Sequence, residues 1–152
     1  IEQYGNRKGI VHCVSYSLGQ SIKDRSRFAG RMILGGAAEL EKFVASKDGI
    51  YVSPTAVEGL DMYDDRARFV IFPKVPYLNL ADPIVRVRSE ESPTFYSYKA
   101  MSAIVQGVGR GMRHRDDWVG SFVIDSHFGR LYASQKDGLP RWVKEAIVWP
   151  KR

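Results

Sequence analysis

The residues with the clearest chemical potential lie in the segment QGVGRGMRHRDDW, residues 106–118. An α-helix turns by about 100° per residue, so Arg110 would lie about 40° from Gln106 and Arg113 about 20° to its other side. The three side chains would share one narrow polar stripe. Arginine is always charged and offers a rigid fork of donors that suits phosphate oxygens. The spacing is therefore typical either of an arginine pair aimed at a phosphate group or of a solvated basic face.

Glycines at positions 107, 109 and 111 accompany these side chains. Glycine costs a helix about 1 kcal/mol relative to alanine, so three of them need a reason, such as the close approach of a ligand or of another backbone. A dinucleotide-binding fingerprint is not that reason, because it needs a third glycine where Met112 stands and it opens a helix. A solvated basic face does not explain the glycines either.

The rest of the chain predicts the elements that position this segment. Short apolar, often β-branched runs indicate buried strands, and amphipathic stretches indicate helices. The predicted strands span 9–15, 31–34, 49–53, 68–72 and 120–125, and the predicted helices span 37–46, 92–113 and 139–149, with 18–28 as a helix or a loop. This alternation predicts one α/β domain, residues 1–152, with a mostly parallel central sheet flanked by helices. Binding residues are then expected after the strands, at their carboxyl ends.

Several details of these elements can be checked against a structure. In the long helix, Ser92 is expected to cap and Pro93 to occupy the first helical position. Residues 73–91 contain three prolines and are expected to form a long surface excursion. Further side chains are predicted to be buried or to dock on the core: His12, Cys13, Ala38, Leu40, Phe43, Val44, Trp142, Ile147 and Val148.

Composition limits the possible functions only loosely. Lys and Arg number 23 against 17 Asp and Glu, so the net charge is +6, which favours a polyanionic partner weakly. Cys13 is the only cysteine, so neither an intrachain disulfide nor a cysteine-based metal centre can form, and with three histidines we expect no metal ligands in this chain. No apolar run approaches the ~18 residues of a membrane helix, and no membrane partner is expected.

Five segments, met in order along the chain, resemble one family. The residues Gln106-x-x-Gly109-Arg110-x-x-Arg113 match Q-x-x-G-R-x-x-R, motif VI of superfamily 2 helicases. SPTAVEGLDMYDD (53–65) resembles motif V of XPD/DinG-like DNA helicases, and KGIVHCVSYS (8–17) resembles their motif IV strand and loop. FVIFPKVPYLNLADP (69–83) is similar to their IIxKxPYPxxxDP stretch, and FVIDSHFGRL (122–131) to their xILDxRF strand.

This resemblance implies the C-terminal (second) RecA-like motor domain of an ATP-dependent DNA helicase, a three-layer α/β fold, with movement from 5′ to 3′. The family's phosphate loop and acidic Mg²⁺ box belong to the first motor domain, and neither is found in this sequence. Because the chain also starts with Ile1 and not Met, we expect a part of a longer helicase that is inactive alone. The implied cofactors are ATP and Mg²⁺, held mainly by the first motor domain. The implied partners are single-stranded DNA and that first RecA-like domain of the same polypeptide, in an intracellular setting, the cytoplasm or the nucleus.

The resemblance also assigns roles to individual residues. Arg110 and Arg113 are implied as catalytic arginines that reach the nucleotide across the domain cleft. Further nucleotide contacts are expected from Gln106, Gly109, Glu58, Gly59 and Asp61. Contacts with the DNA strand are expected from Ser15, Tyr16, Ser53, Pro54, Thr55 and Lys74.

Alternatives remain open at this point. Arg110 and Arg113 could instead form ion pairs with Asp116 or Asp117, and Tyr16 could be a half-buried packing residue. The chain departs from the family at Leu78, Ala81, Thr55, His114 and Arg115, which could alter nucleic-acid contacts. The main competing function is a stand-alone, non-catalytic nucleic-acid-binding α/β module. A nucleotide-binding oxidoreductase ranks last, because the chain lacks both its fingerprint and an acid–base pair.

Overall fold

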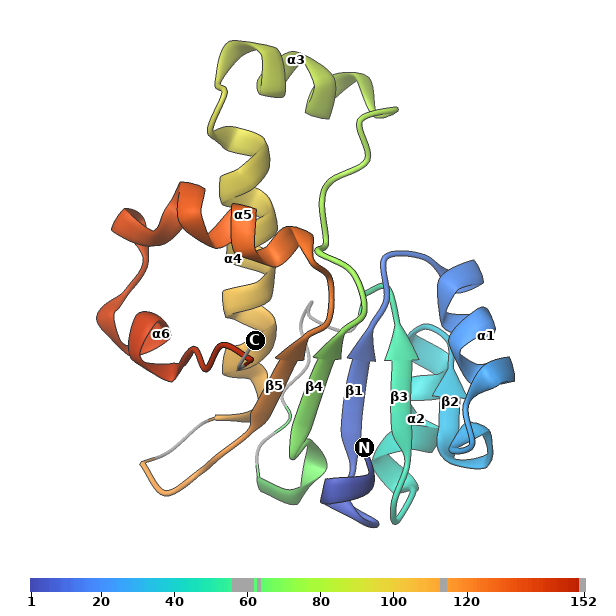
Figure 1. Ribbon diagram of the computed structural model, residues 1–152. Helices are drawn as coiled ribbons and strands as arrows, with labels where there is room; N and C mark the ends of the chain where they lie inside the picture. The colour runs from blue at the N-terminus through green and yellow to red at the C-terminus, as the bar shows by residue number, and fades with distance from the viewer. Residues whose placement is uncertain (56–61, 63, 113–114, 151–152) are drawn as a thin grey trace.

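Five strands form one parallel sheet, in the order β2-β3-β1-β4-β5 (Figure 1). The computed structural model describes residues 1–55, 62, 64–112 and 115–150, with only the backbone of Arg110. The strands are β1 (Gly9–His12), β2 (Met32–Leu34), β3 (Ile50–Ser53), β4 (Phe69–Phe72) and β5 (Gly120–Val123). All four strand pairings are parallel, so the strands begin along one edge of the sheet and end along the other. We call these the amino edge and the carboxyl edge.

Helices connect the strands and cover the sheet. They are α1 (Tyr16–Arg25), α2 (Ala37–Ala45), α3 (Pro83–Glu91), α4 (Phe95–Val108), α5 (His127–Gln135) and α6 (Arg141–Ala146). Short 3₁₀ turns are η1 (Glu2–Tyr4), η2 (Ala29–Arg31), η3 (Asp64–Arg66), η4 (Gly109–Gly111) and η5 (Lys136–Gly138).

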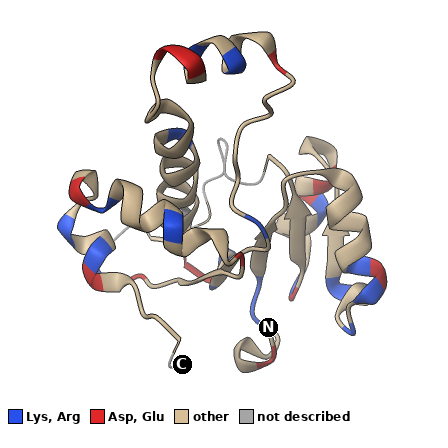
Figure 2. Cartoon of the chain, turned by 45° about the horizontal axis from the view of Figure 1, so that its top comes forward, with Lys and Arg blue, Asp and Glu red and all other residues tan. Residues whose placement is uncertain are grey.

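Figure 2 shows Lys and Arg spread over the helices as well as the sheet edges. The net charge therefore does not by itself locate a binding site.

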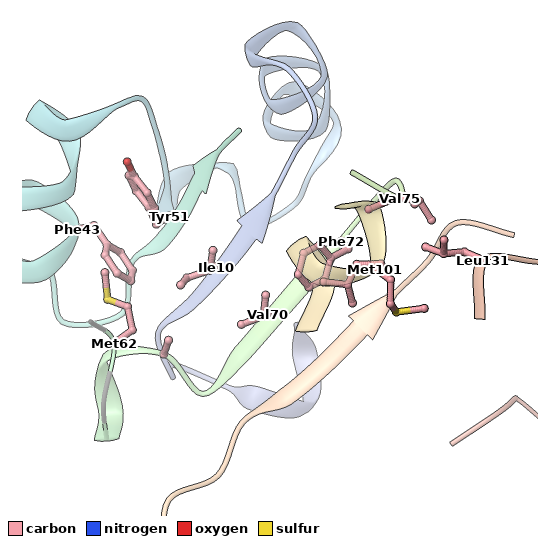
Figure 3. Close-up of a cluster of buried hydrophobic side chains, with 12 residues drawn as sticks. Ile10, Phe43, Tyr51, Met62, Val70, Phe72, Val75, Met101 and Leu131 are labelled. Atoms are coloured by element: carbon pink, nitrogen blue, oxygen red, sulfur yellow. The ribbon is translucent and has the colours of Figure 1, made fainter. Parts of the chain in front are cut away.

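The core has two halves because alternate strand residues point to opposite faces of the sheet. On one face, Ile10, Tyr51 and Val70 pack with residues of α2, α4 and α5 (Figure 3). On the other face, Val11 and Val52 belong to a second cluster, which includes Leu18 and Ile22 of α1. Helices therefore lie on both faces of the sheet, and the predicted three-layer α/β fold is confirmed.

All five predicted strands exist, with shifted ends. The strand predicted over 9–15 ends at His12, so Ser15 does not belong to it. Ser15 instead caps α1, accepting a hydrogen bond from the Leu18 N–H at 3.2 Å, and Tyr16 is the first residue of that helix. The stretch 18–28, predicted as helix or loop, is mostly helical. His12 and Cys13 are buried, as predicted.

The C-terminal third was predicted less well. The helix expected over 139–149 covers only Arg141–Ala146, and the predicted docking residues Trp142 and Val148 are 45% and 90% exposed. Helix α5 was not predicted, although its buried Leu131 joins the core. Packing of this region therefore depends on α5 and not on α6.

Helix boundaries elsewhere also differ. Helix α4 begins at Phe95 with Thr94 as the N-cap residue, so the cap predicted at Ser92 with Pro93 in the helix is wrong. In α2, Phe43 is fully buried, as predicted. Val44 is 44% exposed and Ala38 is also exposed, so the prediction that these two side chains are buried is wrong.

The excursion 73–91 contains a helix of its own, α3. Its Asp82 cap accepts from the Ile84 N–H at 2.8 Å, and Pro83 stands in the first turn.

Candidate functional site

The motif VI segment, residues 106–113, leads to the amino edge of the sheet. Helix α4 runs opposite to the strands and ends beside their starts (Figure 1). A Cβ added at Gly111 would lie 2.9 Å from the Val119 side chain and 3.0 Å from the Ala67 carbonyl oxygen. Ala67 lies two residues before β4, and Val119 immediately precedes β5. The segment therefore ends at the amino edge and not at the carboxyl ends of strands, where binding residues were expected.

The helical face predicted for Gln106, Arg110 and Arg113 does not continue as a regular helix. Helix α4 ends at Val108, η4 follows, and Met112 is extended with φ −126° and ψ 115°. Gln106 is exposed on α4, and Met112 is 38% exposed. The extrapolation at 100° per residue therefore fails beyond Val108. The Arg110 side chain and all of Arg113 lie outside the described residues, so their shared orientation stays a prediction.

The glycines of this segment lie in different surroundings. Gly107 is buried within α4. Gly111 is enclosed by Val119 and the Ala67 carbonyl, so the close approach that required this glycine comes from the protein itself. Around Gly109, by contrast, an added Cβ would meet no atom within 4 Å. Of Gly109 and Gly111, it is thus Gly109 that has space beside its backbone among the described residues.

Arg68 organises the amino edge, a role that the sequence did not indicate. Its side chain is 10% exposed, and its Nη1 donates to Asp117 Oδ1 at 2.5 Å and to the Trp118 carbonyl oxygen at 3.0 Å. Its Nε donates to Asp65 Oδ1 at 2.9 Å. Burial opposes the charged guanidinium, yet the hydrogen bonds and charges of Asp65 and Asp117 raise its pKa above the ordinary value. Asp117, the candidate partner of the motif VI arginines, thus engages Arg68.

Lys8 is a second buried cation at this edge. Its Nζ donates to the carbonyl oxygens of Val44 at 2.9 Å and Ser46 at 3.0 Å, at the end of α2. Burial, followed by the charge of Arg66, lowers the pKa of Lys8. Lys8 closes the C-terminus of a helix, where a cation is favourable, and its ammonium group is not directed at an external ligand.

The predicted DNA-contacting residues all lie at the carboxyl edge. Ser53 ends β3 and is followed by Pro54 and Thr55. Ser15 and Tyr16 follow β1, and Lys74 follows β4. Because these three strands are neighbours and strands lie about 4.8 Å apart, the residues share one stretch of the edge. The structure thus brings together all six residues of this predicted set.

These residues differ in how far they face the surface. Tyr16 is 50% exposed, and Thr55 and Lys74 are also exposed. Ser53 is fully buried, its Oγ accepts from the Thr55 N–H at 3.2 Å, and it lies 3.1 Å from Thr55 Oγ1. The Ser15 hydroxyl is half-buried in its capping position. Ser53 and Ser15 therefore shape the backbone, and the outer surface belongs to the other residues.

Two helices begin at the carboxyl edge. Helix α1 starts after β1, and α2 starts after β2 at Gly36. The Tyr16 hydroxyl would lie 3.3 Å from a Cβ at Gly36, so the Tyr16 side chain reaches the start of α2. Helix N-termini carry partial positive charge, which favours phosphate groups nearby.

Asp125 links the segments that follow β4 and β5, a role that sequence reasoning did not assign to it. Its Oδ2 accepts from the Val75 N–H at 3.0 Å, and its Oδ1 accepts from the His127 N–H at 3.0 Å. The His127 Nδ1 lies 3.1 Å from the same Oδ1. The His127 N–H, together with that of Val75, lowers the pKa of the Asp125 carboxyl group. The carboxylate thereby fixes the backbone next to Lys74. The aspartate of the stretch that is similar to xILDxRF was a signal that could have pointed to it.

Other predicted residues have simpler outcomes. His12 is buried against the edge of Phe72 with ring centroids 5.4 Å apart, and burial lowers its pKa to about 4. Glu58, Gly59 and Asp61 lie outside the described residues. Within the described ranges, His, Cys, Asp and Glu form no group of three or more that could hold a metal ion. In the same part of the chain, no helix is both long and apolar enough to cross a membrane.

Comparison with known proteins decides the family. A family model described as "Helicase C-terminal domain" matches residues 35–146. The chain belongs to this family. This helicase C-terminal domain is 29% identical over 122 residues to the Fanconi anemia group J protein homolog of Gallus gallus, covering 70% of this chain and 10% of that protein. It is 30% identical over 105 residues to the ATP-dependent DNA helicase chl1 of Schizosaccharomyces pombe, covering 59% of this chain and 12% of that protein.

Solved structures agree with the fold. An XPD helicase matches 85% of this chain and 27% of its own with a TM-score of 0.61 at 16% identity. The Xpd4 protein of S. tokodaii matches 93% of this chain and 31% of its own with a TM-score of 0.56 at 18% identity. The resemblance to the second RecA-like domain of XPD/DinG-like helicases is thereby confirmed. The chain spans about a tenth of the two curated relatives named above.

Proposed function

We propose that this domain is the second motor domain of an ATP-dependent DNA helicase that uses the two edges of its sheet for different ligands. The amino edge would complete the ATP site, and the carboxyl edge would contact single-stranded DNA. The observation that carries the proposal is the separation of the two predicted sets. Motif VI leads to the starts of β4 and β5, whereas the six DNA candidates follow the ends of β3, β1 and β4.

At the amino edge, Arg110 and Arg113 would stabilise the charge on the phosphoryl oxygens during hydrolysis. Such arginines contribute about 10³–10⁵ in rate. The phosphate loop and the Mg²⁺ ligands would come from the first motor domain, so the ATP would lie between the two domains. The open space beside Gly109 would admit the nucleotide close to the backbone. Gln106 would contact a phosphate, and motif V would add Glu58, Gly59 and Asp61.

At the carboxyl edge, the exposed groups match what a single strand offers. Lys74 would neutralise a phosphate, and the Thr55 hydroxyl with nearby helix N–H groups would donate to others. Pro54 and the Tyr16 ring present faces on which a base or sugar can rest, since stacking on an aromatic ring tolerates any base. Ser53 and Ser15 would hold these groups in place from within.

The rigid sheet between the two edges would couple hydrolysis to movement. A change in the gap between the motor domains, driven by the nucleotide, would displace the carboxyl edge along the strand. The movement that the family resemblance implies is 5′ to 3′, within a polypeptide that also contains the first RecA-like domain.

Reconstitution with the first motor domain tests this function. ATP hydrolysis is measured for this chain alone, for the first motor domain alone, and for the two joined, each with and without single-stranded DNA. We expect DNA-stimulated hydrolysis only from the joined protein, and salt-dependent DNA binding from this chain alone. If this chain bound DNA but added nothing to hydrolysis, a stand-alone binding module would be the better description.

A further inference from the structure

One buried ion pair joins residues that follow the two segments to which the nucleotide site is assigned. Arg68 lies just before β4, and Asp117 lies in the turn before β5, 49 residues later. The side chain of Asp117 is 0% exposed and that of Arg68 is 10% exposed. The contact between Nη1 and Oδ1, at 2.5 Å, is therefore shielded from water.

The groups around this pair come from both segments. Asp117 Oδ2 accepts from the Asp64 N–H at 3.4 Å, and its Oδ1 also accepts from the Trp118 N–H at 3.0 Å. Asp64 and Asp65 close the motif V segment, residues 53–65, and Asp65 accepts from Arg68 Nε. Asp117 and Trp118 come shortly after the motif VI segment. A single guanidinium thus links the end of motif V to the turn that follows motif VI.

Aromatic side chains also pack near the Arg68–Asp117 ion pair. The Arg68 guanidinium carbon lies 5.1 Å from the centroid of the Trp118 ring system, and that of Arg7 lies 4.9 Å from it. Tyr4 stacks on Trp118 with ring centroids 6.3 Å apart. Since Trp118 is held from several sides, the turn that carries Asp117 has a defined position at the amino edge.

Stability alone is a poor reason for this arrangement. A buried ion pair can often be replaced by apolar residues of similar volume without loss of stability, and in some proteins its value is to fix one arrangement among several. Here the arrangement that it fixes is the relative position of motifs V and VI. A guanidinium is suited to that task, because its planar fork binds several acceptors at once.

We infer that Arg68, through Asp117, is a positioning residue of the nucleotide site, aligning motifs V and VI on one nucleoside triphosphate. The inference rests on the function proposed above. Arg68 makes no contact with the nucleotide itself. Its loss would misplace groups that do, and misplacement by about 1 Å can cost on the order of 100-fold in rate.

Two variants test this role in the helicase with both motor domains. Arg68→Lys keeps the charge but loses the fork, and Arg68→Met combined with Asp117→Leu replaces the pair by an apolar contact. Both should lower kcat/KM for ATP by roughly 10- to 100-fold. Single-stranded DNA affinity should stay unchanged, because the carboxyl edge is untouched.

Arg31→Lys provides the matched control. Arg31 is also mostly buried, with a 17% exposed side chain, and donates to the carbonyl oxygens of Asp48, Gly5 and Arg7 at 2.7–2.9 Å. None of these belongs to motif V or VI. At a temperature where thermal unfolding shows both proteins fully folded, Arg31→Lys should keep the wild-type kcat/KM.

The outcomes separate positioning from stability. Equal kcat/KM for Arg68→Lys and Arg31→Lys in the folded state would overturn the inference. So would wild-type kcat/KM in the folded Arg68→Met/Asp117→Leu protein; should that protein not fold, the two lysine variants decide alone. Loss of the proposed function would look different, because Arg110→Ala and Arg113→Ala would then leave hydrolysis intact.

Discussion

The two edges of the sheet use their polar residues in opposite ways. At the amino edge, Lys8 and Arg68 are buried and bonded to carbonyl and carboxylate groups of the protein. At the carboxyl edge, Lys74 and Thr55 are exposed, and Tyr16 is half-exposed. A site that must align reacting atoms benefits from fixed surroundings, whereas a strand that slides benefits from open, adaptable contacts. The difference supports a division between hydrolysis at one edge and strand binding at the other.

The largest expected effect comes from the motif VI arginines. In the two-domain helicase, Arg110→Ala and Arg113→Ala should each lower kcat for ATP by about 10³–10⁵, because the transition-state charge loses its partner. Single-stranded DNA affinity should be kept, since the proposal assigns these residues to the amino edge and not to the DNA-contacting set. Arg25→Ala, an exposed arginine on α1, is the control and should hydrolyse ATP normally. Normal turnover in both motif VI variants would remove the catalytic assignment.

A pair of glycine variants sharpens the description of the amino edge. Gly111→Ala should destabilise the domain by about 1–3 kcal/mol, because the new methyl group meets Val119 and the Ala67 carbonyl oxygen. Gly109→Ala should leave stability unchanged or raise it by about 0.4–1 kcal/mol, since φ −69° and ψ −11° suit alanine. Chemical denaturation measures both values.

The same pair distinguishes packing from ligand approach. In the two-domain helicase, Gly109→Ala should lower kcat/KM for ATP despite its intact fold, if the nucleotide occupies the open space. Unchanged kinetics in this variant would show that the nucleotide does not come close to Gly109. Gly111→Ala, assayed where it remains folded, supplies the comparison.

At the carboxyl edge, stacking should exceed charge in its effect. Tyr16→Ala should weaken single-stranded DNA binding by about 1–3 kcal/mol, the usual contribution of one stacked base, while Tyr16→Phe should retain it. Tyr98→Ala, which removes a tyrosine that is 60% exposed on α4, is the control and should bind normally. If Tyr16→Ala bound single-stranded DNA as tightly as the wild type, Tyr16 would be a packing residue and not a stacking residue.

Lys74→Ala should act mainly through the salt dependence of binding. Loss of one phosphate contact should reduce the slope of log K against log salt by about 0.7 for a single strand. Fluorescence anisotropy titrations at several salt concentrations give this slope. Lys42→Ala changes an exposed lysine of α2 in the same way and should leave the slope unchanged.

Local sequence patterns were enough for the sheet and for the carboxyl edge. Apolar runs such as the one that forms β4 specify buried strands, and parallel order then places the residues after β3, β1 and β4 side by side. The end of α4 could not be predicted in this way. Its course depends on the contact of Gly111 with Ala67 and Val119, and the helix rule at 100° per residue contains no such information.

Hydrogen bonds between residues far apart in the sequence could not be predicted from the sequence either. Arg68 and Asp117 are 49 residues apart, and Asp125 and Val75 are 50 apart, so no periodicity connects them. Sequence reasoning placed Arg68 in a strand and gave Asp117, like Asp116, only as an alternative partner of the motif VI arginines. The residues proposed to contact ligands came from a family pattern, whereas the residues that surround them required the fold.

The smallest expected effect concerns Asp125, which fixes the backbone beside Lys74 at the carboxyl edge. Asp125→Asn should lower the free energy of unfolding by about 1–2 kcal/mol at neutral pH. An amide nitrogen cannot accept the hydrogen bond from the Val75 N–H, and the negative charge of the acceptor is lost. The folded-state pKa of Asp125 lies below its ordinary value. The charged carboxylate therefore stabilises the folded domain fully above the unfolded-state pKa of about 3.9. This stabilisation is lost as the pH falls through the folded-state pKa. Thermal unfolding of both proteins should therefore differ at pH 7 and converge as the pH falls below the folded-state pKa. A gap that persisted in acid would mean that Asp125 stabilises the edge by its shape and not by its charge, and the fixed backbone beside Lys74 would need another cause.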